Sequence, residues 1–319
     1  MPLWAPRWAV TTRRFNFPVT IGNSGTGMPK AATSSPQLQI SGKALVAAAY
    51  LSGQPNHLLG AWGSAGAYPF RIWRIWAALG LLEPDGHGSV KRKAEYKELD
   101  PTEKGHLNYV LGGMMAKAYA ANKLGVPWLA HLSVATRAGY AIRYTGSRRP
   151  DYLGYANNQQ DLVIAEAKGR QNPDKRLKAD LDGKKQTGMV SHVNKTVPVK
   201  RYGILTEAPV SRAVSLYAVE PADVIQVDFD ALQWRRAYYT FARQLADGCA
   251  NDPRPGDGEL WASMDLQVPE AILEWLDRER GLDAWTDVEE RARDEAARFS
   301  RTGQVTTVLP DLLIMRTRG

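Results

Sequence analysis

The sequence predicts a mixed α/β fold of the α+β kind, with helices flanking a mixed central β-sheet. Residues 102–124 carry apolar side chains at three- and four-residue spacing, the pattern of one amphipathic helix. Short apolar runs at 162–164, 200–206 and 214–219 have the length and composition of buried strands. From residue 226 onward, helical spacing recurs in separate stretches. Helices and strands in this order indicate a sheet covered by helices.

The composition and charge of the chain indicate what kind of protein it is and what kind of partner it binds. The chain has 319 residues, of which 44% are hydrophobic and 23% charged, as expected for a globular protein with a sizeable core. Its net charge of +8 and pI near 9.5 favour a polyanionic partner. No apolar stretch approaches the ~20 residues that span a bilayer, so no membrane association is expected.

Cysteine content and the first residues indicate the compartment. Cys249 is the single cysteine, which excludes an internal disulfide and a cysteine-rich zinc site and fits a reducing cytosol. Pro6, Arg7, Arg13 and Arg14 interrupt any continuous apolar segment at the start, against a secretion signal. The expected location is cytoplasmic.

Two acids and a lysine are the strongest chemical signal in the chain. Residues 152–155 and 162–164 read as two strands, and the polar residues 157–160 between them as the turn of a hairpin. Folding that hairpin brings Asp151 beside Glu166. Alternate residues of a strand share a face, so Lys168 points the same way as Glu166.

This constellation suits a hard divalent cation. Proteins commonly supply two carboxylate ligands to a Mg²⁺ ion, and Mn²⁺ takes the same oxygen donors. A lysine beside the metal could orient an attacking water and stabilise charge on a phosphoryl oxygen. The plain alternative is a Glu-x-Lys pair on an exposed sheet face, which is common and carries no chemistry.

Pro150-Asp151, a spacer and Glu166-Ala167-Lys168 together resemble the signature of the PD-(D/E)xK nuclease superfamily. The resemblance covers residues 102–220. It implies a restriction-endonuclease-like core, placed here at 102–225, in which Asp151 and Glu166 bind the metal and Lys168 assists the water.

The resemblance also points to two further residues. Superfamily cores place a helix before the hairpin, often with an acid that contributes to the metal, and Glu103 is the only acid in the helix expected here. An acid in the first turn equally favours the helix dipole, so a structural role for Glu103 stays open. Gln186 occupies the place where some members carry an active-site glutamine.

Residues 37–101 resemble a winged-helix DNA-binding module. Helices are expected at 43–51, capped by Ser41, and at 70–79, followed by a hairpin. In a winged helix the expected DNA contacts are Arg71 and Arg74 on the recognition helix and Lys91, Arg92 and Lys93 on the wing. The alternative is a helical packing module, and Trp73 and Trp76 are expected in the core under both interpretations.

The remaining segments complete the expected organisation. Residues 1–36 are rich in Pro, Gly, Ser and Thr and predict a flexible arm, whose aromatic residues could dock onto the body. Strands are expected at 129–136 and 140–144. A basic helix is expected at 175–193, where Lys184 and Lys185 could meet phosphates. The helical region 226–319 fits a shell around the core or a dimerisation surface, which would make the chain a homodimer.

The function expected from these features is a Mg²⁺-dependent nuclease acting on double-stranded DNA. The alternative is a non-cleaving DNA-binding regulatory or structural protein built on a nuclease-like fold. RNA in place of DNA, and either endo- or exonucleolytic cutting, stay open at this point. The chain lacks a glycine-rich phosphate loop, a His-x-x-x-His pair and a Gly-x-Ser-x-Gly elbow, which disfavours the chemistries that those motifs serve.

Overall fold

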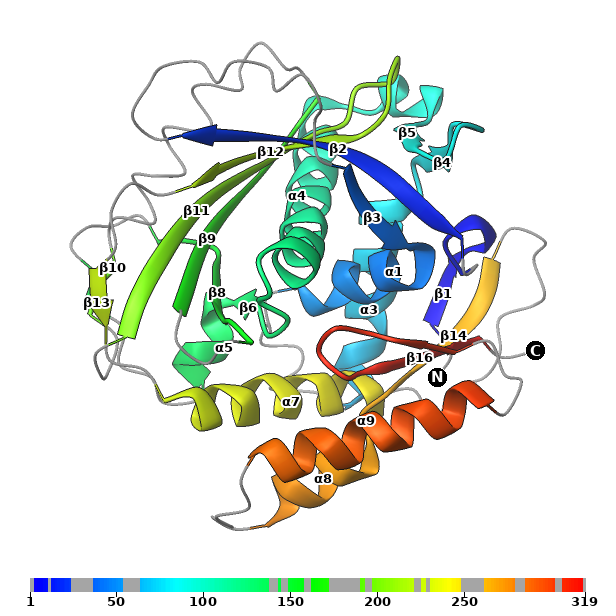
Figure 1. The fold of residues 1–319 in the computed structure, drawn as a ribbon. Helices are drawn as coiled ribbons and strands as arrows, with labels where there is room; N and C mark the ends of the chain where they lie inside the picture. Colours follow the sequence, from blue (N-terminus) through cyan, green and yellow to red (C-terminus); the bar gives the residue numbers. More distant parts are fainter. Residues whose placement is uncertain are drawn as a thin grey trace.

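In the computed structural model, a curled central sheet wraps around one long helix, α4 (Pro101–Lys123), and other helices and a smaller sheet surround this pair (Figure 1). The predicted mixed α/β class is confirmed. The structure describes residues 3–10, 13–23, 37–53, 64–137, 143–144, 149–157, 162–171, 190–192, 197–220, 225–227, 230–247, 261–278, 285–301 and 306–317.

The central sheet is mixed in direction. Strand β9 runs parallel to β11, and β12 runs parallel to β2, whereas the other neighbours are antiparallel. Strand β13 (Ile225–Val227) pairs with the first residues of β11. The strands follow the order β3 (Gln37–Ser41), β2 (Arg14–Asn23), β12 (Ser215–Glu220), β11 (Val197–Glu207), β9 (Leu162–Arg170), β8 (Tyr152–Tyr155) and β6 (Ala130–His131).

The N-terminal segment does not form the predicted flexible arm where the structure describes it. Strand β1 (Leu3–Pro6) and a 3₁₀ turn, η1 (Arg7–Val10), precede β2, which lies inside the central sheet between β3 and β12. Phe15 and Phe17 are fully buried, so these two aromatic residues do dock onto the body. Their alternation with Asn16 and Pro18 is the two-residue period of a half-buried strand, which the surrounding Pro and Gly had obscured.

Helix α1 (Gly42–Leu51) matches the predicted first helix, and the Ser41 side chain accepts a hydrogen bond from Ala44 N at 3.3 Å, as expected for its cap. Helix α3 (Ser64–Leu79) ends as predicted but begins earlier. A hairpin of β4 (Leu82–Pro84) and β5 (Val90–Arg92) and a 3₁₀ turn, η2 (Ala94–Glu98), follow. Both α1 and α3 pack against α4, and their buried side chains belong to the same hydrophobic cluster as the central sheet.

The prediction that the tryptophans of α3 lie in the core is wrong. Trp73 and Trp76 are 47% and 50% exposed, whereas Ile75, Ala78 and Leu79 supply the buried face of the helix. Both faces of the predicted helix carried large apolar side chains, so their spacing did not decide which one faces inward.

The segment between α4 and the hairpin contains fewer strand residues than predicted. Strand β6 has two residues, and residues 132–136, expected as strand, lie in helix α5 (Leu132–Arg137). Strand β7 (Arg143–Tyr144) pairs with β10 (Val190–His192), so the end of the predicted basic helix is a strand. A short apolar run suits either a strand or a buried helix, and tertiary packing decided between them here.

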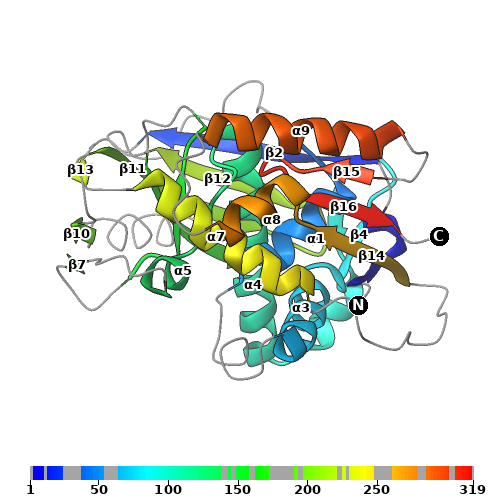
Figure 2. The ribbon, with the colours of Figure 1, turned by 90° about the horizontal axis from the view of Figure 1, so that it is seen from below.

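The C-terminal region contains the predicted helices together with a second sheet. Helices α7 (Ala231–Asp247), α8 (Glu270–Asp277) and α9 (Trp285–Arg301) gather on the side of the molecule that Figure 2 faces. Strand β1 joins three C-terminal strands in the order β1, β14 (Trp261–Gln267), β16 (Ile314–Thr317) and β15 (Thr306–Val308). The two ends of the described chain are therefore held in one sheet.

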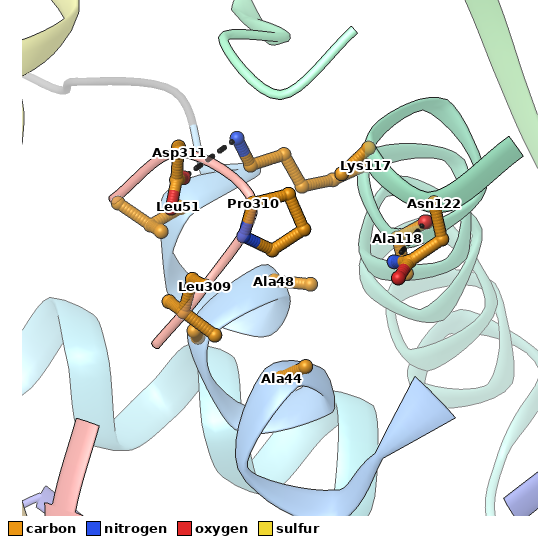
Figure 3. A pocket seen from close by; sticks show the side chains of 11 residues that line it. Ala44, Ala48, Leu51, Lys117, Ala118, Asn122, Leu309, Pro310 and Asp311 are labelled. Atoms are coloured by element: carbon orange, nitrogen blue, oxygen red, sulfur yellow. Dashed lines mark hydrogen bonds and ion pairs between the residues drawn. The ribbon is translucent and has the colours of Figure 1, made fainter. Parts of the chain in front are cut away.

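A buried ion pair ties the C-terminal region to α4. Lys117 Nζ lies 3.4 Å from Asp311 Oδ2, beside a small hollow bordered by alanines of α1 and α4 (Figure 3). The same ammonium donates to Pro127 O at 2.6 Å and to the Tyr238 hydroxyl at 2.7 Å. The Tyr238 hydroxyl in turn donates to the Asp311 carboxylate. One charge thus joins α4, α7 and the turn before β16.

We expect Lys117→Met to lower the free energy of unfolding by about 3–5 kcal/mol, because it leaves the Asp311 carboxylate buried without a cation. The double variant Lys117→Met/Asp311→Asn removes both charges and should lose clearly less than the sum of the single variants. Urea denaturation of the four proteins gives the coupling energy. Strictly additive losses would contradict a direct interaction between the two groups.

Helix α4 also makes a close contact with β9, which its glycines permit. A methyl group on Gly112 would lie 2.7 Å from Gly169 N and 2.9 Å from the Lys168 carbonyl carbon. We therefore expect Gly112→Ala to cost about 1–3 kcal/mol of stability through overpacking. Gly105, in the exposed first half of the same helix, has open space around it, so Gly105→Ala should stabilise the protein by about 0.5–1 kcal/mol. Thermal melts of the two variants should shift in opposite directions.

Candidate active site

The predicted hairpin forms and brings the two acids together. Strands β8 and β9 are antiparallel, with Tyr152 opposite Ala165, which places Asp151 opposite Glu166 at the next position. The Asp151 carboxylate turns toward β9, where its Oδ2 accepts a hydrogen bond from Ala167 N at 3.0 Å. The hydrogen bond fixes this carboxylate at the point where the hairpin ends.

Glu166 and Lys168 share one face of β9, as the two-residue period predicted. Lys168 Nζ donates to Glu166 Oε1 at 2.5 Å. The Glu166 side chain is 2% exposed and that of Lys168 is 26% exposed, so the carboxylate is buried and the ammonium reaches toward solvent. On β11, the residue paired with Glu166 is Gly203, which contributes no side chain beside the carboxylate.

Both carboxyl groups of the hairpin have raised pKa values. Burial raises the pKa of Glu166 to about 8, the Asp151 charge acts in the same direction, and Lys168 opposes both. Burial also raises the pKa of Asp151, although the Ala167 N–H and the Lys168 ammonium partly offset it. Lys168 lowers the pKa of both acids but does not offset the effect of burial, and carboxyl groups perturbed in this way are common at functional sites.

The donor set fits a hard divalent cation. Within the described residues, no group of three or more His, Cys, Asp or Glu side chains is arranged to hold a metal. Mg²⁺ commonly takes only one or two protein carboxylates and completes its shell with water and substrate phosphate. Asp151 and Glu166 supply those two carboxylates, and a cation between them would favour their charged forms, which burial disfavours.

The Arg74 side chain lies beneath the hairpin and does not reach the surface. The guanidinium is 2% exposed, and it donates to Ala49 O at 3.0 Å and to Ser52 Oγ at 2.9 Å. Tyr152, the residue after Asp151, donates its hydroxyl to Ser52 O at 3.0 Å. The expectation that Arg74 contacts DNA is therefore wrong, because its side chain caps the end of α1 beneath the candidate site.

His131 lies next to the site, although the sequence analysis did not single it out. It pairs with Tyr152 across β6 and β8, and the two rings meet edge to face at 5.9 Å. Burial, followed by the positive charge of Arg74, lowers the pKa of His131 to about 4, so the ring is neutral at pH 7. The Ser133 N–H donates to Nδ1 at 3.2 Å, which leaves the proton on Nε2. Only the pairing of β6 with β8 reveals this neighbour.

Glu103 is a capping residue and not a metal ligand. Its Oε2 accepts from Asp100 N at 3.0 Å, while Asp100 Oδ1 accepts from Thr102 N at 2.6 Å and from Glu103 N at 3.0 Å. This reciprocal pair is a capping box at the start of α4. Of the two roles open from the sequence, the structural role is confirmed.

The predicted wing residues have structural contacts. Arg92 is 2% exposed, donates to Ala208 O and Asn108 Oδ1 at 2.8 Å each, and lies 3.8 Å over the Tyr96 ring. The expectation that Arg92 contacts DNA is therefore wrong. Lys91 forms a partly exposed ion pair with Glu83 at 3.3 Å. Lys93 is half-buried.

Several predicted residues lie outside the described part of the chain. These are Gln186, Lys184 and Lys185, together with the side chain of Arg71. Among the described helices, none combines the length and apolar character needed to cross a membrane.

Comparison of the chain with protein-family models, with curated proteins and with solved structures gives no match. What this chain does must therefore be inferred from the residues that the fold brings together.

The raised pKa of Glu166 predicts how stability depends on pH. In the unfolded chain Glu166 loses its proton around its ordinary pKa of 4.5, whereas in the folded chain it keeps the proton up to about pH 8. The free energy of unfolding therefore falls as the pH rises from about 4.5, and the loss is complete above about pH 8. In metal-free buffer we expect Glu166→Gln to raise the free energy of unfolding by roughly 4 kcal/mol at pH 8, because a rise in pKa from 4.5 to about 8 costs about 1.4 kcal/mol per unit, and to have little effect at pH 4.5. Urea denaturation across this range measures the difference. A gain that does not vary with pH would contradict the burial of an ionisable carboxyl group.

Proposed function

We propose that this protein is a metal-dependent nuclease that hydrolyses phosphodiester bonds in DNA. The observation that carries the proposal is the convergence of Asp151, Glu166 and Lys168 at the end of the β8–β9 hairpin. A buried carboxylate beside a second, partly buried carboxylate is costly to fold, which is expected where a site is preserved for chemistry.

Each residue has a defined role in this proposal. Asp151 and Glu166 would hold Mg²⁺ or Mn²⁺, which when bound supplies a Lewis acid for the phosphate oxygens. Lys168 is partly exposed, so its ammonium can orient a water molecule and stabilise charge on the phosphate. The oxygen of that water adds to phosphorus, a phosphorus–oxygen ester bond breaks, and the products are a phosphomonoester and an alcohol.

The topology supports a restriction-endonuclease-like core. Helix α4 precedes β6, β8 and β9, the motif strand β9 lies inside the sheet, and β11 returns parallel to it. This order and the Asp…Glu-x-Lys pattern agree with the resemblance to the PD-(D/E)xK superfamily.

The DNA assignment rests on charge and on the site's chemistry. A net charge of +8 suits a polyanion, and two carboxylates with one lysine suit a phosphodiester. The helix–helix–hairpin order of α1, α3, β4 and β5 supports the winged-helix interpretation, but the burial of Arg74 and Arg92 removes two of its proposed DNA contacts.

The test is cleavage of labelled duplex DNA under Mg²⁺ titration. Glu166→Gln should abolish saturable Mn²⁺ binding in calorimetry and reduce cleavage about a hundredfold or more, because the neutral amide no longer attracts a hard cation. Lys168→Ala should retain Mn²⁺ binding and still lower the cleavage rate about a hundredfold.

Glu98→Gln and Lys97→Ala make the same chemical changes on exposed residues of η2 and serve as matched controls with parental activity. Parental cleavage by Glu166→Gln would refute the assignment. A parent protein that binds DNA without cutting it would favour the non-cleaving alternative.

A further inference from the structure

One turn of α4 lies directly against the ends of the two site strands. The closeness of this contact is seen from where a methyl side chain on each glycine would lie. A methyl group on Gly112 would lie 2.7 Å from Gly169 N, and one on Gly113 would lie 2.2 Å from the Tyr152 hydroxyl. A methyl group on Gly169 would meet Asn108 O at 1.8 Å. Residues 108–113 of α4 therefore pack against both β8 and β9 at the level of the candidate site.

Tyr109 is the accessible side chain of this turn. It precedes Gly113 by one helical turn, so the two residues share one side of α4. At Gly113 this side faces the Tyr152 hydroxyl and the Arg74 guanidinium, since a methyl group placed on Gly113 would lie 3.5 Å from the guanidinium. The side chain is 44% exposed, whereas the residues of α4 from Val110 to Ala120 are buried. Tyr109 thus stands where the helix emerges from the core beside the hairpin.

Helix α4, which carries Tyr109, lies on the sheet face opposite Lys168. Gly169 packs against α4, so its strand neighbour Lys168 and also Glu166 project to the other face. A phosphate held at the hairpin end between these faces would have an ammonium on one side and a phenol on the other.

The state of the hydroxyl is set by its surroundings. Burial raises the pKa of Tyr109, the Asp151 and Glu166 charges add to this, and the positive charge of Arg74 opposes it. The hydroxyl therefore keeps its proton at neutral pH. It can donate a hydrogen bond, and it is not a phenolate nucleophile.

We propose that Tyr109 is a further catalytic residue, whose hydroxyl donates a hydrogen bond to a non-bridging oxygen of the phosphate that is cleaved. This role rests on the proposed nuclease function. Two carboxylates repel an anionic phosphate, so a neutral donor on the side away from Lys168 helps to hold the phosphate in line with the attacking water.

The test compares Tyr109→Phe with the parent protein and with Tyr96→Phe. Both substitutions remove a hydroxyl and keep the ring, and Tyr96 lies in η2, where its hydroxyl donates to a backbone oxygen, Lys104 O, at 3.5 Å. We expect Tyr109→Phe to slow single-turnover cleavage roughly tenfold to a hundredfold, the usual loss for a hydrogen bond to a charged group. Mn²⁺ affinity and the melting temperature should stay at parental values, and Tyr96→Phe should cleave at the parental rate.

A second readout separates this inference from the nuclease proposal. Oligonucleotide affinity, measured in EDTA by fluorescence anisotropy, should fall severalfold in Tyr109→Phe. Parental cleavage and parental affinity in that variant would overturn the role of Tyr109 while leaving the nuclease intact. Weakened affinity in a chain that never cleaves would keep the phosphate contact and refute the nuclease. Parental affinity in such a chain would refute both.

Discussion

The contact between α4 and β9 is the constraint on which the candidate site depends. At Gly112 and Gly169 the backbones of helix and strand meet with no side chain between them, and at Gly113 the helix leaves room only for the Tyr152 hydroxyl and the Arg74 guanidinium. Helix and hairpin cannot slide past each other without a clash. This close fit fixes the hairpin that carries Asp151 and Glu166 against α4.

The cost of the site is electrostatic. Glu166 is buried next to a second acid and has its ion pair with Lys168 as partial compensation, so its charged form is disfavoured. The Lys117–Asp311 pair is buried at both ends, and its ammonium is also held by a carbonyl and a hydroxyl. The two arrangements differ in what they do: the second joins segments far apart in sequence, whereas the first would leave negative charge for the proposed cation to neutralise.

The basic character of the chain divides between the surface and the interior. Arg74 and Arg92 bind carbonyl oxygens and polar side chains in places where the chain changes direction, and each has a ring within 6 Å of its guanidinium. Arginine suits this use because its planar fork presents several donors and packs well on aromatic rings. A basic residue in a sequence is therefore weak support for a DNA contact until its burial is known.

The sequence by itself determined the features that depend on neighbours along the chain. The cap of α1, the extent of α4, the β8–β9 hairpin and the meeting of Asp151 with Glu166 all follow from short-range periodicity and turn chemistry. Only the tertiary structure decided that β2 lies inside the central sheet, that β1 joins the C-terminal strands, that Arg74 is buried and that Trp73 is exposed. Strand partners and the inward face of a helix are chosen by packing between segments far apart in sequence, and local residue patterns do not encode that choice.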